Sequence, residues 1–170
     1  DSRPWPEYRR KHIPDGISCP GGELVYRLGD LAPDPATPVI VNCAGRTRSV
    51  LGAKALIDAG VPNPVFSLVD GTFGWWRSGH AIAQGDGPRA GPVGAASRDR
   101  AAAAAARLAG RCAVTELDAA GLALWQREAG RHPLYLLDVR EPEEYAAGHV
   151  EGARHAPGGQ LVECPEDWIG

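Results

Sequence analysis

The stretch PVIVNCAGRTRS, residues 38–49, decides the fold of the first half of the chain. It opens with a short β-branched run, which is typical of a buried parallel strand. Residues 49–59 then carry apolar side chains at helical spacing, and Gly60 follows as a stop. Strand, loop and helix in this order predict an α/β fold. They place Cys43 at the carboxyl end of the strand, where ligand sites of open α/β sheets face solvent.

The loop after this strand combines a thiol with positive charge. Arg46 and Arg48 follow Cys43 closely, and the amides before the next helix converge on one point. Both features stabilise a thiolate, which is the nucleophilic form of cysteine. Gly45 permits a close backbone approach or a positive φ angle. The pattern predicts a reactive Cys43; a buried structural thiol is the alternative, which the arginines disfavour.

An internal repeat divides the chain. DSRPWPEY, starting at Asp1, aligns with DVREPEEY, starting at Asp138, and the register holds without a gap as far as PGGELV and PGGQLV. In the second copy the motif follows the apolar run LYLL, residues 134–137, which predicts a buried strand. The first copy has nothing upstream, and the second ends before an equivalent cysteine loop. We therefore expect two related modules, each truncated.

The repeat and the composition suggest three parts. They are a module at 1–83 that lacks its first strand and holds the active loop 43–49, a Gly/Pro/Ala-rich linker with a helix at 84–111, and the N-terminal half of a second module at 112–170. Ser97 is expected to cap the linker helix. One hypothesis is that residues 115–137 supply the helix and strand missing before Asp1, in cis or by swapping between chains.

Several side chains are expected to have structural roles. The Asp, Arg and Glu of each repeated motif predict a salt bridge rather than acid–base chemistry. His12 and His149 are interpreted as turn or packing residues, since no metal-ligand spacing surrounds them. Core positions are expected for at least one of Trp75 and Trp76, and for the apolar side chains of an amphipathic helix that opens near residue 115, namely Leu117, Leu122 and Trp125.

The cysteine loop and its flanking motifs resemble the rhodanese family. Besides CAGRTR at 43–48, the family-like stretches are DVR at 138–140, HVEGA at 149–153 and LVDGTFGW at 68–75. Together they cover most of the chain. The tandem arrangement is similar to an internal piece of a multidomain bacterial rhodanese. The resemblance implies three-layer α/β/α modules with a mainly parallel sheet.

The resemblance also implies a sulfurtransferase. Cys43 would take a sulfane sulfur from thiosulfate or a related donor as a persulfide and pass it to a thiophilic acceptor, cyanide or a thiol. Substrate-binding roles fall on the rest of the loop: Ala44, Gly45, Arg46, Thr47, Arg48 and Ser49. Neither a metal nor a cofactor is implied.

Two other functions compete with this one. A cysteine-loop phosphatase also cradles a thiolate with amides and an arginine, but it has five residues between Cys and Arg, whereas Cys43 and Arg48 are separated by four. A noncatalytic rhodanese-like binding module is the second alternative. The retained Cys43 and both arginines disfavour it for the first copy.

Composition narrows the partners and the compartment. A formal net charge of −3 gives no basic field for nucleic acid. No apolar run approaches the roughly 20 residues that span a membrane, and the four cysteines form no dense framework. We expect a cytoplasmic protein with reduced thiols, whose partners are a small anionic sulfur donor and a thiophilic acceptor. Neighbouring rhodanese modules or a second copy of the chain are the other partners considered.

Overall fold

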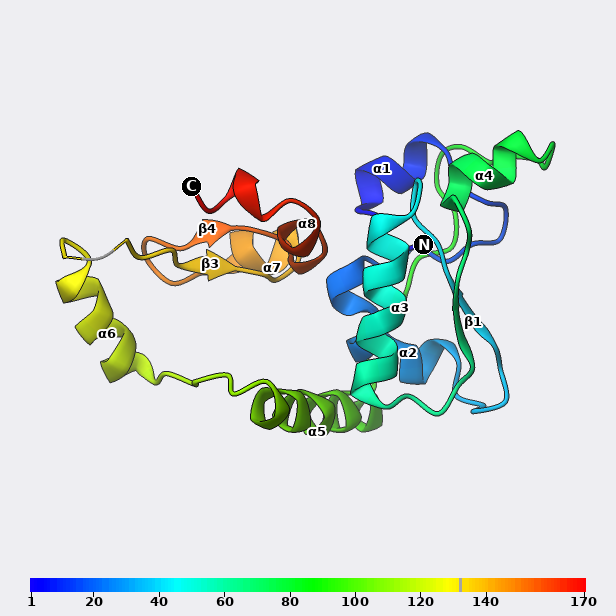
Figure 1. The fold of residues 1–170 in the computed structure, drawn as a ribbon. Coiled ribbons are helices and arrows are strands. Elements are labelled where there is room, and N and C mark those ends of the chain that lie inside the picture. The colour runs from blue at the N-terminus through cyan, green and yellow to red at the C-terminus, as the bar shows by residue number, and fades with distance from the viewer. Residues whose placement is uncertain (132) are drawn as a thin grey trace.

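The computed structural model describes residues 1–131 and 133–170. Figure 1 shows two α/β units, one built from α1 to α4 and the other from β3 to α8, with the long helix α5 leading from one toward the other. The elements in chain order are α1 (Trp5–Arg10), η1 (Gly21–Glu23), α2 (Leu24–Leu31), β1 (Val39–Val41), α3 (Thr47–Ala59), β2 (Val65–Ser67), α4 (Gly71–Arg77), α5 (Ala95–Arg111), α6 (Ala119–Glu128), β3 (Leu137–Asp138), α7 (Pro142–Ala147), β4 (Arg154–His155), α8 (Gly158–Glu163) and η2 (Pro165–Asp167).

The first module is built on two parallel strands, β1 and β2, which the helix α3 connects. Val41 faces a core formed with α2 and α3, whose main members are Leu24, Leu28 and Leu56. The predicted parallel α/β arrangement is therefore confirmed. The α3 helix ends where expected, because Gly60 adopts the left-handed conformation at its C-terminus.

The expected three layers are not complete in the first module. Helices α2 and α3 cover the face of the sheet that carries Val41, but Ile40 and Phe66, which are paired on the opposite face, are more than half exposed. Alternate residues of a strand point to opposite faces, so both faces need a covering layer to bury a β-branched run. Within the described residues, only one of these two layers is present.

The internal repeat recurs in the structure as the same set of hydrogen bonds. In both copies the arginine pairs with the aspartate two residues before it, and the tyrosine hydroxyl donates to a backbone carbonyl eight residues further on. The contacts are Arg3–Asp1 and Arg140–Asp138, then Tyr8–Gly16 and Tyr145–Ala153. The expected structural salt bridge is confirmed, and each repeat histidine stacks on the tyrosine of its own copy.

The second module shows the strand that precedes the repeated motif. Strand β3 pairs in parallel with β4, while β1 pairs with β2. In the first module Asp1 and Ser2 occupy the matching place, since the Cys19 amide donates to the Asp1 carbonyl and the Ser2 amide to the Asn42 carbonyl. The hypothesis that residues 115–137 complete the first module in cis is thus wrong: β3 is committed to its own module.

The two modules meet through glycines of the repeated PGG motif. A Cβ on Gly21 would lie 3.6 Å from the Gly159 Cα, and one on Gly22 would lie 3.6 Å from the Gly158 Cα. Gly21 matches Gly158 in the repeat, and Gly22 matches Gly159. Gly21 therefore contacts the counterpart of Gly22, and Gly22 contacts the counterpart of Gly21. Such a crossed contact is what an approximate two-fold relation produces.

Helix α5 packs against α2 and α3 rather than standing apart as a linker. Arg107 and Arg111 donate to carbonyls in the last turn of α3, where cations are favourable. The helix begins at Ala95, so the expectation that Ser97 caps it is wrong: Ser97 is the third residue of the helix, is buried, and accepts a hydrogen bond from Arg100. Among the described residues, no helix combines the length and the apolar character that crossing a membrane requires.

Helix α6 carries no buried residue. Asp118 caps it by accepting from the Gly121 amide. The expected core roles of Leu117 and Trp125 are wrong, since both side chains are about half exposed. Amphipathic spacing predicts which face of a helix is apolar but not whether another element covers that face.

Candidate active site

Cys43 lies two residues beyond the end of β1, as the strand-loop-helix pattern predicts. Its side chain is only 2% exposed, so the expectation that the loop presents it to solvent is wrong. The thiol lies beneath the loop and donates to the Ser49 Oγ at 3.6 Å. The sulfur is therefore shielded from solvent and contacts the Ser49 hydroxyl.

Ser49, at the start of α3, connects the thiol to the backbone of the loop. Its buried hydroxyl donates to the Arg46 carbonyl at 2.8 Å and accepts from the Ser67 Oγ at 3.0 Å. A hydroxyl has one proton and two lone pairs, so Ser49 can rotate to donate to an anionic sulfur instead. Ser67, at the end of β2, keeps this hydroxyl in place. Sequence reasoning missed Ser67, because the contact depends on how β2 pairs with β1.

The floor of the loop rests on the start of α4. The Thr72 amide donates to the Cys43 carbonyl at 2.8 Å, and the Phe73 amide donates to the Ala44 carbonyl at 2.9 Å. Gly71 allows this approach: its φ is +51°, and a Cβ there would lie 2.3 Å from the Cys43 carbonyl oxygen. The glycine needed for a close approach is therefore Gly71. Gly45 does not have a positive φ, and a Cβ on it would meet no atom within 4 Å.

The two loop arginines lie in different surroundings. The side chain of Arg46 is exposed at the mouth of the loop, beside the exposed Thr47. Arg48 is mostly buried and donates two hydrogen bonds to Glu7, from Nη1 at 2.6 Å and from Nη2 at 2.9 Å. Its Nε lies 3.0 Å from a carboxylate oxygen of Glu163, which is an ion pair without hydrogen-bond geometry.

These carboxylates determine the state of Arg48. Burial alone would lower the pKa of Arg48, but the hydrogen bonds and charge of Glu7, together with the charge of Glu163, raise it above its ordinary value. Glu7 also lies 3.8 Å from Arg3, which is bonded to Asp1. We call the alternating series Asp1, Arg3, Glu7, Arg48 and Glu163 the charge chain. It runs from the repeated motif, past the active loop, into α8 of the second module.

Asn42 links the charge chain to the cysteine. Its side-chain amide donates to Asp1 and to the Thr72 hydroxyl, both at 3.1 Å. The residue before Cys43 is thereby fixed on both sides. Glu7 was expected in a salt bridge of its own motif, but its pairing with Arg48 and the role of Glu163 were not predicted, because their sequence distance from the loop gives no local signal.

The other cysteines differ from Cys43 in their surroundings. Burial raises the pKa of Cys19 to about 12, so this thiol is protonated and unreactive at neutral pH. Cys112 is exposed, and Cys164 is intermediate in exposure. Desolvation, together with nearby acidic side chains, raises the pKa of Cys164. No cluster of His, Cys, Asp and Glu able to hold a metal occurs in the part of the chain that the structure describes.

Aromatic side chains of α4 flank the loop. Phe73 and Trp76 are each more than half exposed, and Trp75 is partly buried, with its indole N–H donating to the Ala81 carbonyl. Neither tryptophan is a core residue, which differs from the expectation. A depression of about 570 Å³ lies along this helix, and its lining includes Asp70, Trp75, Arg77 and His80.

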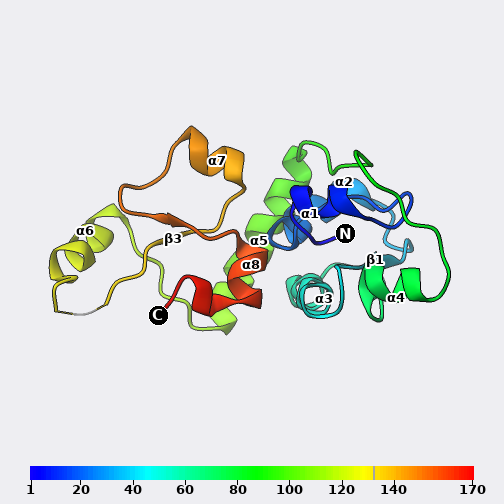
Figure 2. The ribbon, with the colours of Figure 1, turned by 90° about the horizontal axis from the view of Figure 1, so that it is seen from above.

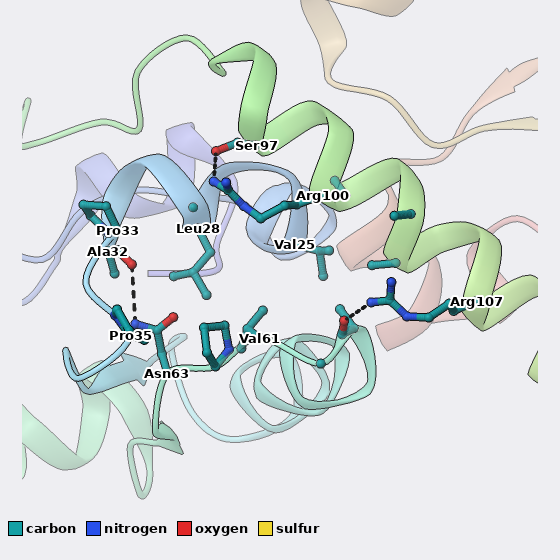
Figure 3. A pocket seen from close by; sticks show the side chains of 17 residues that line it. Val25, Leu28, Ala32, Pro33, Pro35, Val61, Asn63, Ser97, Arg100 and Arg107 are labelled. Carbon is teal, nitrogen blue, oxygen red and sulfur yellow. Dashed lines mark hydrogen bonds between the residues drawn. The ribbon is translucent and has the colours of Figure 1, made fainter.

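A second cavity, of about 410 Å³, lies between α2, α3 and α5 (Figure 3). Small side chains of α5, such as Ala101 and Ala104, leave this space open against Val25 and Leu28. Arg100 and Arg107 border it, each bonded to a protein group, as the dashed lines in Figure 3 show. Its lining does not include Cys43, so it is separate from the candidate active site.

Comparisons with known proteins identify the family. The rhodanese-like domain model matches residues 1–78 and 118–170, and the chain belongs to the rhodanese-like domain family. The chain is also similar to the crystal structure of thiosulfate sulfurtransferase from Pseudomonas aeruginosa, with 51% sequence identity and a TM-score of 0.94. That match covers 98% of this chain and 32% of the other, so the chain spans about a third of the solved relative. No curated protein matches the chain.

Proposed function

We propose that the protein is a sulfurtransferase that carries sulfur as a persulfide on Cys43. The observation that supports this best is the position of the thiol: it lies at the end of β1, under a loop that leads into α3, and it contacts the Ser49 hydroxyl. We infer that loop amides join the Ser49 hydroxyl around the sulfur, and such a setting suits a thiolate and, after reaction, a persulfide anion. The similarity to a thiosulfate sulfurtransferase supports thiosulfate as the donor.

The proposed reaction has two displacement steps. The Cys43 thiolate attacks the outer sulfur of thiosulfate, the S–S bond of the donor breaks, and sulfite leaves with the bonding electron pair. An acceptor, cyanide or a thiolate, then attacks the outer sulfur of the persulfide and releases the Cys43 thiolate. These steps resemble thiol–disulfide exchange, and they need no metal or redox cofactor.

The loop residues have different roles in this reaction. Arg46 is exposed at the loop mouth, so we assign it to the anionic end of the donor, with Thr47 beside it. The amides of Ala44 and Gly45 and the hydroxyl of Ser49 stabilise the sulfur. Arg48 adds positive charge behind the loop, where Glu7 and Glu163 hold it. Because Cys43 is covered, the loop has to shift to admit the donor.

The engagement of Arg48 disfavours the phosphatase alternative. In that mechanism the arginine has to bind the phosphoryl oxygens, whereas the hydrogen bonds and ion pairs of Arg48 go to two carboxylates. The chemistry also requires a reduced Cys43, so we propose a reducing compartment such as the cytoplasm. In the complete protein we propose three-layer modules, with a further helical layer over Ile40 and Phe66.

Intact-mass analysis tests the function directly. The full-length protein is treated with thiosulfate, desalted and weighed under nonreducing conditions. We expect a gain of one sulfur atom that cyanide removes; Cys43→Ser abolishes the gain, and Cys112→Ser, which removes an exposed thiol, retains it. A cyanide-labile sulfur on the Cys43→Ser variant would rule the proposal out, as would hydrolysis of an aryl phosphate that depends on Cys43.

A further inference from the structure

The active loop of the first module touches the second module through one charged residue. Figure 2 shows α8 at the edge of the second module, between β3 and α3, and α8 packs against α3. Glu163, the last residue of α8, pairs with Arg48 in the first turn of α3. Arg48 lies five positions after Cys43 in the chain, so the pair fixes the back of the loop from outside its own module.

Arg48 is held from two sides. Its Nη1 and Nη2 groups donate to the two carboxylate oxygens of Glu7 in a bidentate contact, and the Glu163 carboxylate forms an ion pair with its Nε. The side chain of Arg48 is 12% exposed, and those of Glu7 and Glu163 are 31% and 28% exposed. At such burial an ion pair is screened less by salt than a surface pair. Two carboxylates with this geometry leave the guanidinium little freedom to turn toward the loop mouth.

We propose that Glu163 is a positioning residue for sulfur transfer, acting through Arg48 across the boundary between the modules. It keeps Arg48 behind the loop, so that Arg46 alone meets the donor and the loop keeps the conformation in which Ser49 contacts the sulfur. This inference rests on the proposed function. The contact is not a general property of the repeat, because Tyr26 is the residue of the first module that matches Glu163.

Single-turnover persulfide formation in the full-length protein tests the proposal. Glu163→Gln removes the charge and keeps the size, and Glu166→Gln, on an exposed residue three positions further on, is the matched control. We expect the maximal rate to fall about fivefold to tenfold in Glu163→Gln, which is in the usual range for coupled contacting residues. The half-saturating thiosulfate concentration should not rise, because the variant has one negative charge fewer near the site. Glu163→Asp, which keeps the charge, should recover most of the rate.

Two further measurements separate positioning from mere docking of the modules. Amide hydrogen exchange in the segment 43–50 should speed up in Glu163→Gln and not in Glu166→Gln, and Glu7→Gln combined with Glu163→Gln should act non-additively. An unchanged or faster rate of persulfide formation in Glu163→Gln overturns the proposal. A decrease in rate that is fully explained by a larger fraction of unfolded protein also overturns it. If the unaltered protein forms no persulfide, the proposed function fails, whereas the exchange experiment still reports on the contact itself.

Discussion

Gly71→Ala is the substitution with the sharpest expected effect on the active loop. The left-handed backbone at Gly71 would cost an alanine roughly 1–2 kcal/mol. In addition, its Cβ would lie 2.3 Å from the Cys43 carbonyl oxygen and 2.6 Å from that of Gly45, so the backbone of the loop has to move. Forcing extra volume into a packed site costs about 1–3 kcal/mol. We therefore expect a total loss of about 2–5 kcal/mol in the free energy of unfolding.

Gly79→Ala is the matched control for this change. Gly79 also has a positive φ, +84°, but a Cβ there meets no atom within 4 Å, so only the backbone cost remains. Urea denaturation followed by circular dichroism gives both free energies. Gly71→Ala should be less stable than Gly79→Ala by about 1–3 kcal/mol and should form persulfide more slowly. Equal stabilities within about 0.5 kcal/mol would refute the close approach between Gly71 and the loop.

Three more outcomes are expected. Ser49→Ala should slow persulfide formation by about tenfold, because the sulfur loses a hydrogen-bonding hydroxyl. Single-turnover mass analysis measures this rate. A rate equal to that of the unaltered protein would contradict the role of Ser49. The hydrogen bonds from Arg140 lower the pKa of Asp138 from 3.8 to about 2, so the carboxylate stabilises the fold fully above pH 4 and progressively less as the pH falls toward 2. Asp138→Asn should therefore be less stable at pH 6 and approach the unaltered protein near pH 2 in denaturation experiments, and a pH-independent difference would be inconsistent with this. Iodoacetamide at pH 8 should modify Cys112 rapidly and leave Cys19, with its pKa of about 12, untouched in peptide maps.

The parts of the fold that follow from local patterns were predictable. The β-branched run before Cys43 and the helix up to Gly60 form as expected, and the repeat of the Asp-Arg motif predicted the same salt bridge twice. Each of these features depends on residues close together in the sequence. Local spacing and turn chemistry carry that information.

The parts that depend on distant contacts were not predictable. In the sequence, Arg46, Thr47 and Arg48 look equivalent as ligand residues. In the structure, however, Arg48 pairs with Glu7, which lies 41 residues before it, and with Glu163 in the second module. Likewise, the spacing of Leu117 and Trp125 predicts an apolar face, but whether that face is covered depends on packing that a sequence pattern does not contain.

The glycine contact between the modules has a consequence for their origin. Gly21 and Gly22 meet the matching Gly158 and Gly159 in crossed fashion, which means that one surface binds its own duplicate. A single ancestral module with that surface would pair with a second copy of itself, as symmetric dimers do. When two copies are joined in one chain, each module meets the other at a high effective concentration, so their pairing no longer depends on the concentration of free modules. The two halves differ at this boundary: Glu163 of the second module faces the loop of the first, whereas the matching residue of the first module is Tyr26.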